Sequence, residues 1–129
     1  MDKLTVYAVP LGRVLLATLF LFAGANKAGH PSGTISFISA AGLPFPELGY
    51  AIALVVEIGG GLLILMGYQT RLVALGMALF TIATAVAFHN NFGEQLQMTM
   101  FMKNLAIAGG FLVLSAHGGG ALSVDNNKG

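Results

Sequence analysis

The sequence predicts an all-α fold: four membrane-spanning helices in an antiparallel up-and-down bundle, with a short interfacial helix in the first outer loop. Apolar residues (AVILMFWYC) make up 56% of the 129 residues and charged residues only 9%, whereas a soluble domain carries about 25% charged residues. Four apolar runs approach the roughly 20 residues that a helix needs to cross the membrane. They lack the alternating polarity of membrane-barrel strands, so helices are the structures that satisfy their backbone within lipid.

Four apolar segments make up the predicted spans. They are Val6–Ala25, Leu48–Met66, Leu72–Phe88 and Met98–Ala116. Gly67–Arg71 connects the second span to the third, and a turn this short makes the two helices antiparallel neighbours. Pro10 is compatible with the start of the first span, because the missing N–H of proline is not needed in the first helical turn. Residues 117–129 are expected to form a polar, mobile tail.

The long connection, residues 26–47, is where we expect the short helix. Within it, Thr34–Ala41 places Ile35, Ile38 and Ala41 on one side, a pattern typical of a helix lying at the membrane surface. A following Gly-Leu-Pro run ends this helix. Long loops in compact domains are more often functional than idle, and a mobile linker is the alternative.

The N-terminal segment also admits a second interpretation. Lys3 and Arg13, the apolar stretch Val14–Phe22 and the Ala-Gly-Ala run after it resemble the charged, apolar and cleavage-site parts of a signal peptide. Cleavage would leave three spans and discard Arg13. Four spans remain the main prediction.

Basic residues near the span ends predict the orientation. With four spans, one side carries Lys3, Arg13, Arg71 and Lys128, and the other side carries Lys27 and Lys103. Because segments rich in Lys and Arg stay in the cytoplasm, both termini are expected there. The long loop would then lie on the outer, non-cytoplasmic side of the membrane.

Charge, cysteine and histidine content exclude several classes of function. The net charge of +1 is too small for the phosphate neutralisation that nucleic-acid binding requires. The absence of cysteine excludes thiolate chemistry and cysteine-bound zinc or iron–sulfur clusters. His30, His89 and His117 show no spacing typical of a metal site or a haem pair, and no flavin fingerprint is found. Gly59–Gly61 lies within a span, where helix packing explains it better than nucleotide binding.

Glu57 is the centre of the predicted site. It is the tenth residue of the second span, near the bilayer midplane, where an isolated charge costs about 2.5–3.5 kcal/mol and usually finds a partner inside the bundle. Counted at about 1.5 Å per residue, Arg13 and Lys103 lie within roughly 5 Å of its level, a difference that their flexible side chains can cover. The sequence therefore predicts a buried Arg13–Glu57–Lys103 cluster.

Two interpretations of this cluster stay open. Buried ionic groups can simply specify which helices pair. Alternatively, ionisable groups beside a cavity bind a polar ligand or relay protons. In that case Glu57 and His89 are the proton carriers, and the ligand-binding residues are Arg13, Lys27, Lys103 and Asn104.

An ordered set of short motifs points to a known family. The set comprises Gly12-Arg13 with Gly24 and Lys27, Gly42-Leu43-Pro44, Glu57-Ile58-Gly59-Gly60-Gly61, Gly67-Tyr68-Gln69-Thr70-Arg71, Phe88-His89, and the run from Phe101-Met102-Lys103-Asn104 to Gly109-Gly110. In this order it resembles the DoxX family of small bacterial four-helix inner-membrane proteins over nearly the whole chain. The resemblance implies a plasma-membrane protein linked to quinone-dependent oxidoreductase reactions. It implies no catalytic residues.

Three functions are compatible with these features. The first is a component of a redox system that binds a quinone or another flat lipid-soluble ligand, through donors such as Lys103, Asn104, His89 or Arg13. Since the sequence has no group recognisable as an electron store, this function requires a partner subunit or a bound reductant. The second is a non-catalytic membrane subunit or scaffold, and the third is a small proton-coupled transporter that uses Glu57. In each case the lipid bilayer is a partner, and Gly109-Gly110 is a candidate contact for a homo-oligomer.

Overall fold

In the computed structural model, which describes residues 2–127, the chain is helical and forms no strand within that range. The helices are α1 (Lys3–Gly29), α2 (Pro31–Ala40), α3 (Pro46–Leu54), the π-helical turn η1 (Val55–Gly60), α4 (Gly61–Met66), α5 (Thr70–Phe88), α6 (Gln95–His117) and α7 (Val124–Asn127). Together α3, η1 and α4 make one continuous helix. This helix, α1, α5 and α6 are long and apolar enough to cross a membrane, which confirms the predicted all-α fold with four spans.

Local sequence signals explain where the helices begin and end. The carboxylate of Asp2 accepts a hydrogen bond from the N–H of Thr5 at 2.9 Å and caps the first turn of α1. Gly67 ends α4 in the left-handed conformation, with φ of 74°. The short helix expected in the first loop is α2. It begins at Pro31, three residues earlier than predicted, because proline is well suited to the first helical position.

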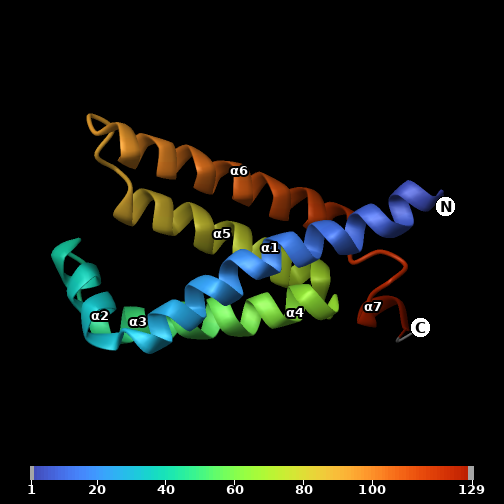
Figure 1. Ribbon diagram of the computed structural model, residues 1–129, viewed down its shortest axis with the longest axis horizontal. Coiled ribbons are helices and arrows are strands. Elements are labelled where there is room, and N and C mark those ends of the chain that lie inside the picture. Colours follow the sequence, from blue (N-terminus) through green and yellow to red (C-terminus); the bar gives the residue numbers. More distant parts are fainter. Residues whose placement is uncertain (1, 128–129) are drawn as a thin grey trace.

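The helices pack as two antiparallel pairs (Figure 1). One pair is α1 with the continuous helix α3–η1–α4, and the other is α5 with α6. Both termini lie at one end of the molecule, which we call the terminal end. The opposite end, with α2 and the α5–α6 connection, is called the loop end.

Small side chains fill much of the space between the helices. Ala17, Ala74 and Ala78 are fully buried, and residues of this size allow membrane helices to approach closely. Phe111 on α6 is the largest fully buried side chain. Its ring centroid lies 5.5 Å from that of Phe20 on α1. This aromatic contact joins the two helix pairs.

The residues after His117 fold back onto the terminal end. Two glycines with φ angles of 90° and 84° turn the chain. The carboxylate of Asp125 then accepts hydrogen bonds from the backbone N–H groups of Gln69 (2.6 Å) and Thr70 (2.8 Å) at the start of α5. The expectation of a mobile tail is therefore wrong for the described part of this segment. Lys128, which contributes to the predicted orientation, lies outside the described residues.

Candidate functional site

The π-helical turn η1 carries Glu57 into the interior of the bundle. Over Val55–Gly60 this turn replaces the α-helical hydrogen-bond pattern, and π-helical turns within α-helices are frequently found at functional sites. Glu57 is only 4% exposed. Its Cβ lies beside Gly24 of α1, so this acidic residue faces the first span.

The close approach of α1 to η1 depends on Gly24. A Cβ atom at this position would lie 2.5 Å from Cγ1 of Ile58 and 3.3 Å from Cβ of Glu57, so a larger residue would push the two helices apart. Lys27 follows three residues later and therefore lies on the same face of α1. This spacing brings a lysine next to the buried carboxylate.

Lys27 and Glu57 form an ion pair, with 3.0 Å between Nζ and Oε1. The glutamate side chain is 5% exposed and the lysine side chain 32%, so the pair is enclosed on the acidic side and partly open on the basic side. The hydroxyl of Tyr50 donates to the carbonyl oxygen of Lys27 at 2.9 Å and ties the end of α1 to α3. The pair thus offers an accessible hydrogen-bond donor next to a carboxylate that can accept a proton.

Arg13 does not join this pair. Its guanidinium donates to the carbonyl oxygens of Ile64 (3.1 Å), Leu65 (2.9 Å) and Leu122. The first two belong to the last turn of α4, where carbonyl groups lack helical partners and form the negative end of the helix dipole. The predicted cluster is therefore wrong in its placement of Arg13, which binds a helix end at the terminal end of the molecule.

Lys103 is also separate from Glu57. Its side chain is exposed, and within residues 2–127 it has no hydrogen-bond or ion-pair partner. The neighbouring Asn104 donates from its amide to the carbonyl oxygen of Thr81 and to Oγ1 of Thr84, both at 3.4 Å. The prediction of a Lys103–Glu57 contact is therefore wrong, because α6 packs mainly on α5 and Asn104 reinforces that packing.

His89 follows α5 at the loop end and is half-buried. Its Nδ1 lies 3.1 Å from Oε1 of Gln97, across the α5–α6 connection. The preceding residue, Phe88, contacts Phe37 of α2 with 5.2 Å between ring centroids. The structure pairs His89 with Gln97 rather than with Glu57, and its role as a proton carrier stays a prediction.

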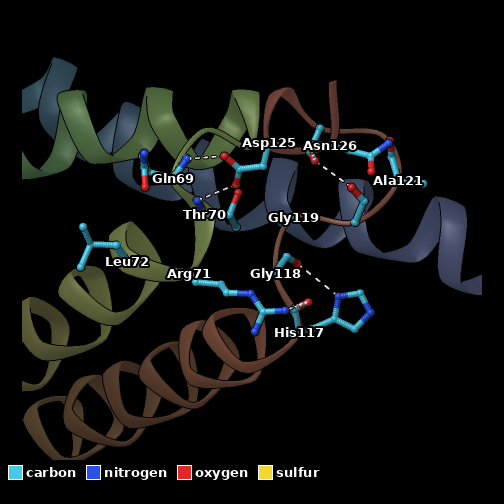
Figure 2. A pocket seen from close by; sticks show the side chains of 12 residues that line it. Gln69, Thr70, Arg71, Leu72, His117, Gly118, Gly119, Ala121, Asp125 and Asn126 are labelled. Atoms are coloured by element: carbon cyan, nitrogen blue, oxygen red, sulfur yellow. Dashed lines mark hydrogen bonds between the residues drawn. The ribbon is translucent and has the colours of Figure 1, made fainter. Parts of the chain in front are cut away.

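A polar pocket of about 710 Å³ lies at the terminal end, between the start of α5, the end of α6 and the chain that follows (Figure 2). Its charged side chains bind helix ends: Asp125 caps α5, and Arg71 donates to the carbonyl oxygens of Ala116 (2.5 Å) and His117 (3.0 Å). A negative charge at a helix N-terminus and a positive charge at a helix C-terminus interact favourably with the helix dipole, so these contacts stabilise the fold. Within the described part of the chain, no three His, Asp or Glu side chains gather into a group that could hold a metal ion.

Comparison with known proteins places the chain in a family. The DoxX family model matches residues 8–90, which include both members of the ion pair. The chain belongs to the DoxX family. Two relatives from Escherichia coli (strain K12) are similar to this DoxX protein over most of its length. Inner membrane protein YqjF is 46% identical over 127 residues, which are 97% of this chain and 95% of the relative. Inner membrane protein YphA is 34% identical over 120 residues, which are 89% of this chain and 86% of the relative. No solved structure matches.

Membership of the DoxX family and four apolar helices together make this an integral membrane protein. Sequence reasoning missed two residues that organise its polar contacts. Tyr50 binds the backbone of Lys27, and no local signal in the sequence predicts that long-range contact. Asp125 lies in the polar tail, and its preference for helix N-termini was a signal for a capping role. The sequence does not show which helix it caps.

Proposed function

We propose that this DoxX protein binds a quinone, or a similarly flat lipid-soluble ligand with carbonyl groups, as the membrane component of a redox system. The observation that carries the proposal is the Lys27–Glu57 pair, with 3.0 Å between its charged atoms and an exposed fraction of 32% on the lysine side. Ionisable residues within membrane spans are costly and mark ligand or proton pathways. A ligand dissolved in the bilayer can approach this pair from the lysine side.

The two side chains supply the polar groups that quinone chemistry needs. The ammonium group of Lys27 donates a charge-assisted hydrogen bond to a quinone carbonyl. Reduction of the quinone to a quinol takes up two electrons and two protons, one proton on each oxygen. Glu57 carries one proton and His89 is the candidate carrier of the other. The electrons come from a partner subunit or a bound reductant.

The competing explanation is that the pair only joins α1 to the second span. Buried ion pairs can have such a role, and replacing both partners with uncharged residues of similar size is often neutral for stability. The π-helical turn favours the functional explanation, because irregular turns of this type are over-represented at functional sites. A variant that removes both charges separates the two explanations.

The test is the double variant Lys27→Met/Glu57→Gln. We expect its melting temperature in detergent to stay close to that of the wild type, because no unpaired buried charge is left. We expect the Kd for a short-chain quinone, measured by titration calorimetry in nanodiscs, to rise about tenfold or more, since a hydrogen bond to a charged donor contributes about 1.5–3 kcal/mol. The matched control is Lys3→Met, which removes an exposed lysine at the terminal end.

The control variant should bind the quinone as the wild type does. If the folded double variant also binds with an unchanged Kd, the pair is structural and the proposed site is wrong. If the wild type itself shows no binding to short-chain quinones, the proposed ligand class is wrong.

We further propose that the protein lies in a bacterial inner membrane with both termini in the cytoplasm. Its two relatives are named inner membrane proteins, and both termini lie at the same end of the molecule (Figure 1). Because the sequence has no cysteine, single cysteines at Gly93 and Asn126 can report the orientation. An impermeant maleimide should label the Gly93 position in intact spheroplasts and the Asn126 position only after permeabilisation. The reverse pattern would contradict this orientation.

A further inference from the structure

Lys103 is a cation in a membrane-spanning helix. It is exposed, and within the described range 2–127 neither a hydrogen bond nor an ion pair neutralises it. It lies eight residues after Gln95, the first residue of α6, so its Cα is about 12 Å along the helix. A charge at this depth is costly. A partner from outside the chain would lower that cost.

The side of α6 that carries Lys103 faces α1. Gly110 is on this side, since a Cβ at Gly110 would lie 3.7 Å from the side chain of Leu16 on α1. Lys103 is seven residues before Gly110, or about two helical turns, and therefore lies on the same side. The contact between Phe111 and Phe20 closes the space between the two helices nearer the terminal end. Lys103 therefore lies on this side of α6, nearer the loop end than the contact between Phe111 and Phe20.

Lys103 and the Lys27–Glu57 pair lie at a similar level in the bundle. Lys27 is seven residues beyond Phe20 on α1, a rise of about 10 Å, and Lys103 is eight residues before Phe111 on the antiparallel α6, about 12 Å. Lys27 and Glu57 neutralise each other at 3.0 Å. The net charge of the three residues is therefore +1 and resides on Lys103.

We propose that Lys103 binds the phosphate group of an anionic phospholipid at the loop end of the molecule. Helical side chains tilt toward the helix N-terminus, which for α6 is the loop end, and a lysine can extend its ammonium group from within the apolar layer to the headgroup region. The adjacent Met102 is 56% exposed and offers an apolar contact for an acyl chain. This site is independent of the proposed quinone site, which does not use Lys103.

The experiment is native mass spectrometry of the full-length protein in detergent, titrated with phosphatidylglycerol or phosphatidylcholine. The variants are Lys103→Met, Lys103→Arg and the control Lys3→Met, which also removes one exposed lysine. We expect the wild type to retain phosphatidylglycerol in preference to phosphatidylcholine. In Lys103→Met, retention should fall about fivefold, the effect of roughly 1 kcal/mol for one lysine near an anionic lipid surface. Lys103→Arg and Lys3→Met should retain the lipid as the wild type does.

Three results would overturn the proposal. The first is equal retention by Lys103→Met and the wild type, and the second is an equal loss in Lys3→Met, which would indicate attraction by overall charge. The third is displacement of phosphatidylglycerol by millimolar inorganic phosphate, which would indicate a site for a soluble anion. Quinone binding, measured on the same Lys103→Met sample, should be unchanged. Failure of the lipid site therefore leaves the quinone proposal standing, and failure of the quinone proposal leaves the lipid site standing.

Discussion

The two ends of the molecule use charged side chains in different ways. At the terminal end, Arg13, Arg71 and Asp125 each bind backbone groups at the end of a helix. Toward the loop end, Lys27 in the last turn of α1 and Glu57 in the middle of the second span bind each other beside a π-helical turn. Every helix end has unsatisfied backbone groups, so the contacts at the terminal end meet a requirement of the fold. No such requirement explains the pair at the loop end.

This difference distinguishes residues that stabilise the fold from residues that are available to a ligand. Changes at the terminal end should lower stability and alter ligand binding only through unfolding. Removal of both charges of the Lys27–Glu57 pair should have the opposite effect: a nearly unchanged stability and weaker ligand binding. Four substitutions test or sharpen this contrast.

Replacement of Arg13 by Met should cause the largest loss of stability. It removes the charged donor to the carbonyl oxygens of Ile64, Leu65 and Leu122, of which the first contact is buried and the other two are partly buried. Because hydrogen bonds to a charged group contribute about 1.5–3 kcal/mol, we expect a loss of about 3 kcal/mol in the free energy of unfolding. Thermal unfolding in detergent, followed by circular dichroism, measures the effect. Unfolding at the wild-type temperature would show that Arg13 does not stabilise the terminal end.

Replacement of Gly24 by Ala should be the next most damaging change. The added Cβ would lie 2.5 Å from Cγ1 of Ile58, and overpacking of this type costs about 1–3 kcal/mol. The matched control is Gly109→Ala on α6, where a Cβ meets no atom within 4 Å and helix propensity favours alanine. Chemical or thermal unfolding should give Gly24→Ala a lower free energy of unfolding than the wild type. The value for Gly109→Ala should equal or slightly exceed that of the wild type. Equal stability of the two variants would contradict the close packing of α1 on η1.

Replacement of Asp125 by Ala should have a smaller effect. It removes the acceptor for the N–H groups of Gln69 and Thr70, and loss of a helix cap costs about 1 kcal/mol. Asp125→Asn should recover much of this loss, because asparagine also caps helices. A protease that cleaves after the α6 helix should cut Asp125→Ala faster than either the wild type or Asp125→Asn. Equal cleavage rates would show that the tail is not held by this contact.

Replacement of Asp2 by Asn should have the smallest effect on stability, restricted to the first turn of α1. The backbone N–H of Thr5 donates to its carboxylate and lowers the pKa of Asp2 from its ordinary value of 3.8. Since the pKa is lower in the folded state, the stabilisation is complete above pH 3.8 and is lost as the pH falls through the folded-state pKa. Amide exchange at Thr5 should therefore be slower in the wild type than in Asp2→Asn at neutral pH, and the two rates should converge as the pH falls through the folded-state pKa. Equal exchange rates at neutral pH would contradict this assignment.

The sequence predicts the fold well because the fold depends on local properties. Span length, apolar content and the short Gly67–Arg71 turn predict four antiparallel helices, and all four are found. The short α2 was also expected, because residues 34–41 carry a helical pattern, although its start at Pro31 was not. The fold of the chain after His117 was missed, since its contacts with α5 involve residues more than 50 positions away.

The partners of Glu57 were predicted less well because depth alone does not determine how helices rotate and pack. Arg13 lies at a suitable depth, but the end of α4 provides a set of carbonyl groups to which it binds. Lys103 also lies at a suitable depth, but α6 packs on α5 and leaves it exposed. Lys27 pairs with Glu57 because Gly24 allows α1 to touch η1. Such a close approach is visible only when the two helices are placed together.

Photoaffinity labelling with an azido-quinone is the most direct test of the proposed role of the loop-end pair. The protein would be labelled in nanodiscs, digested and mapped by mass spectrometry, with excess unlabelled quinone as the competitor. We predict competitor-sensitive labels on the end of α1 near Lys27 and on η1 near Glu57. Labels confined to the terminal end, or spread over all lipid-facing helices and insensitive to the competitor, would contradict a quinone site at this pair.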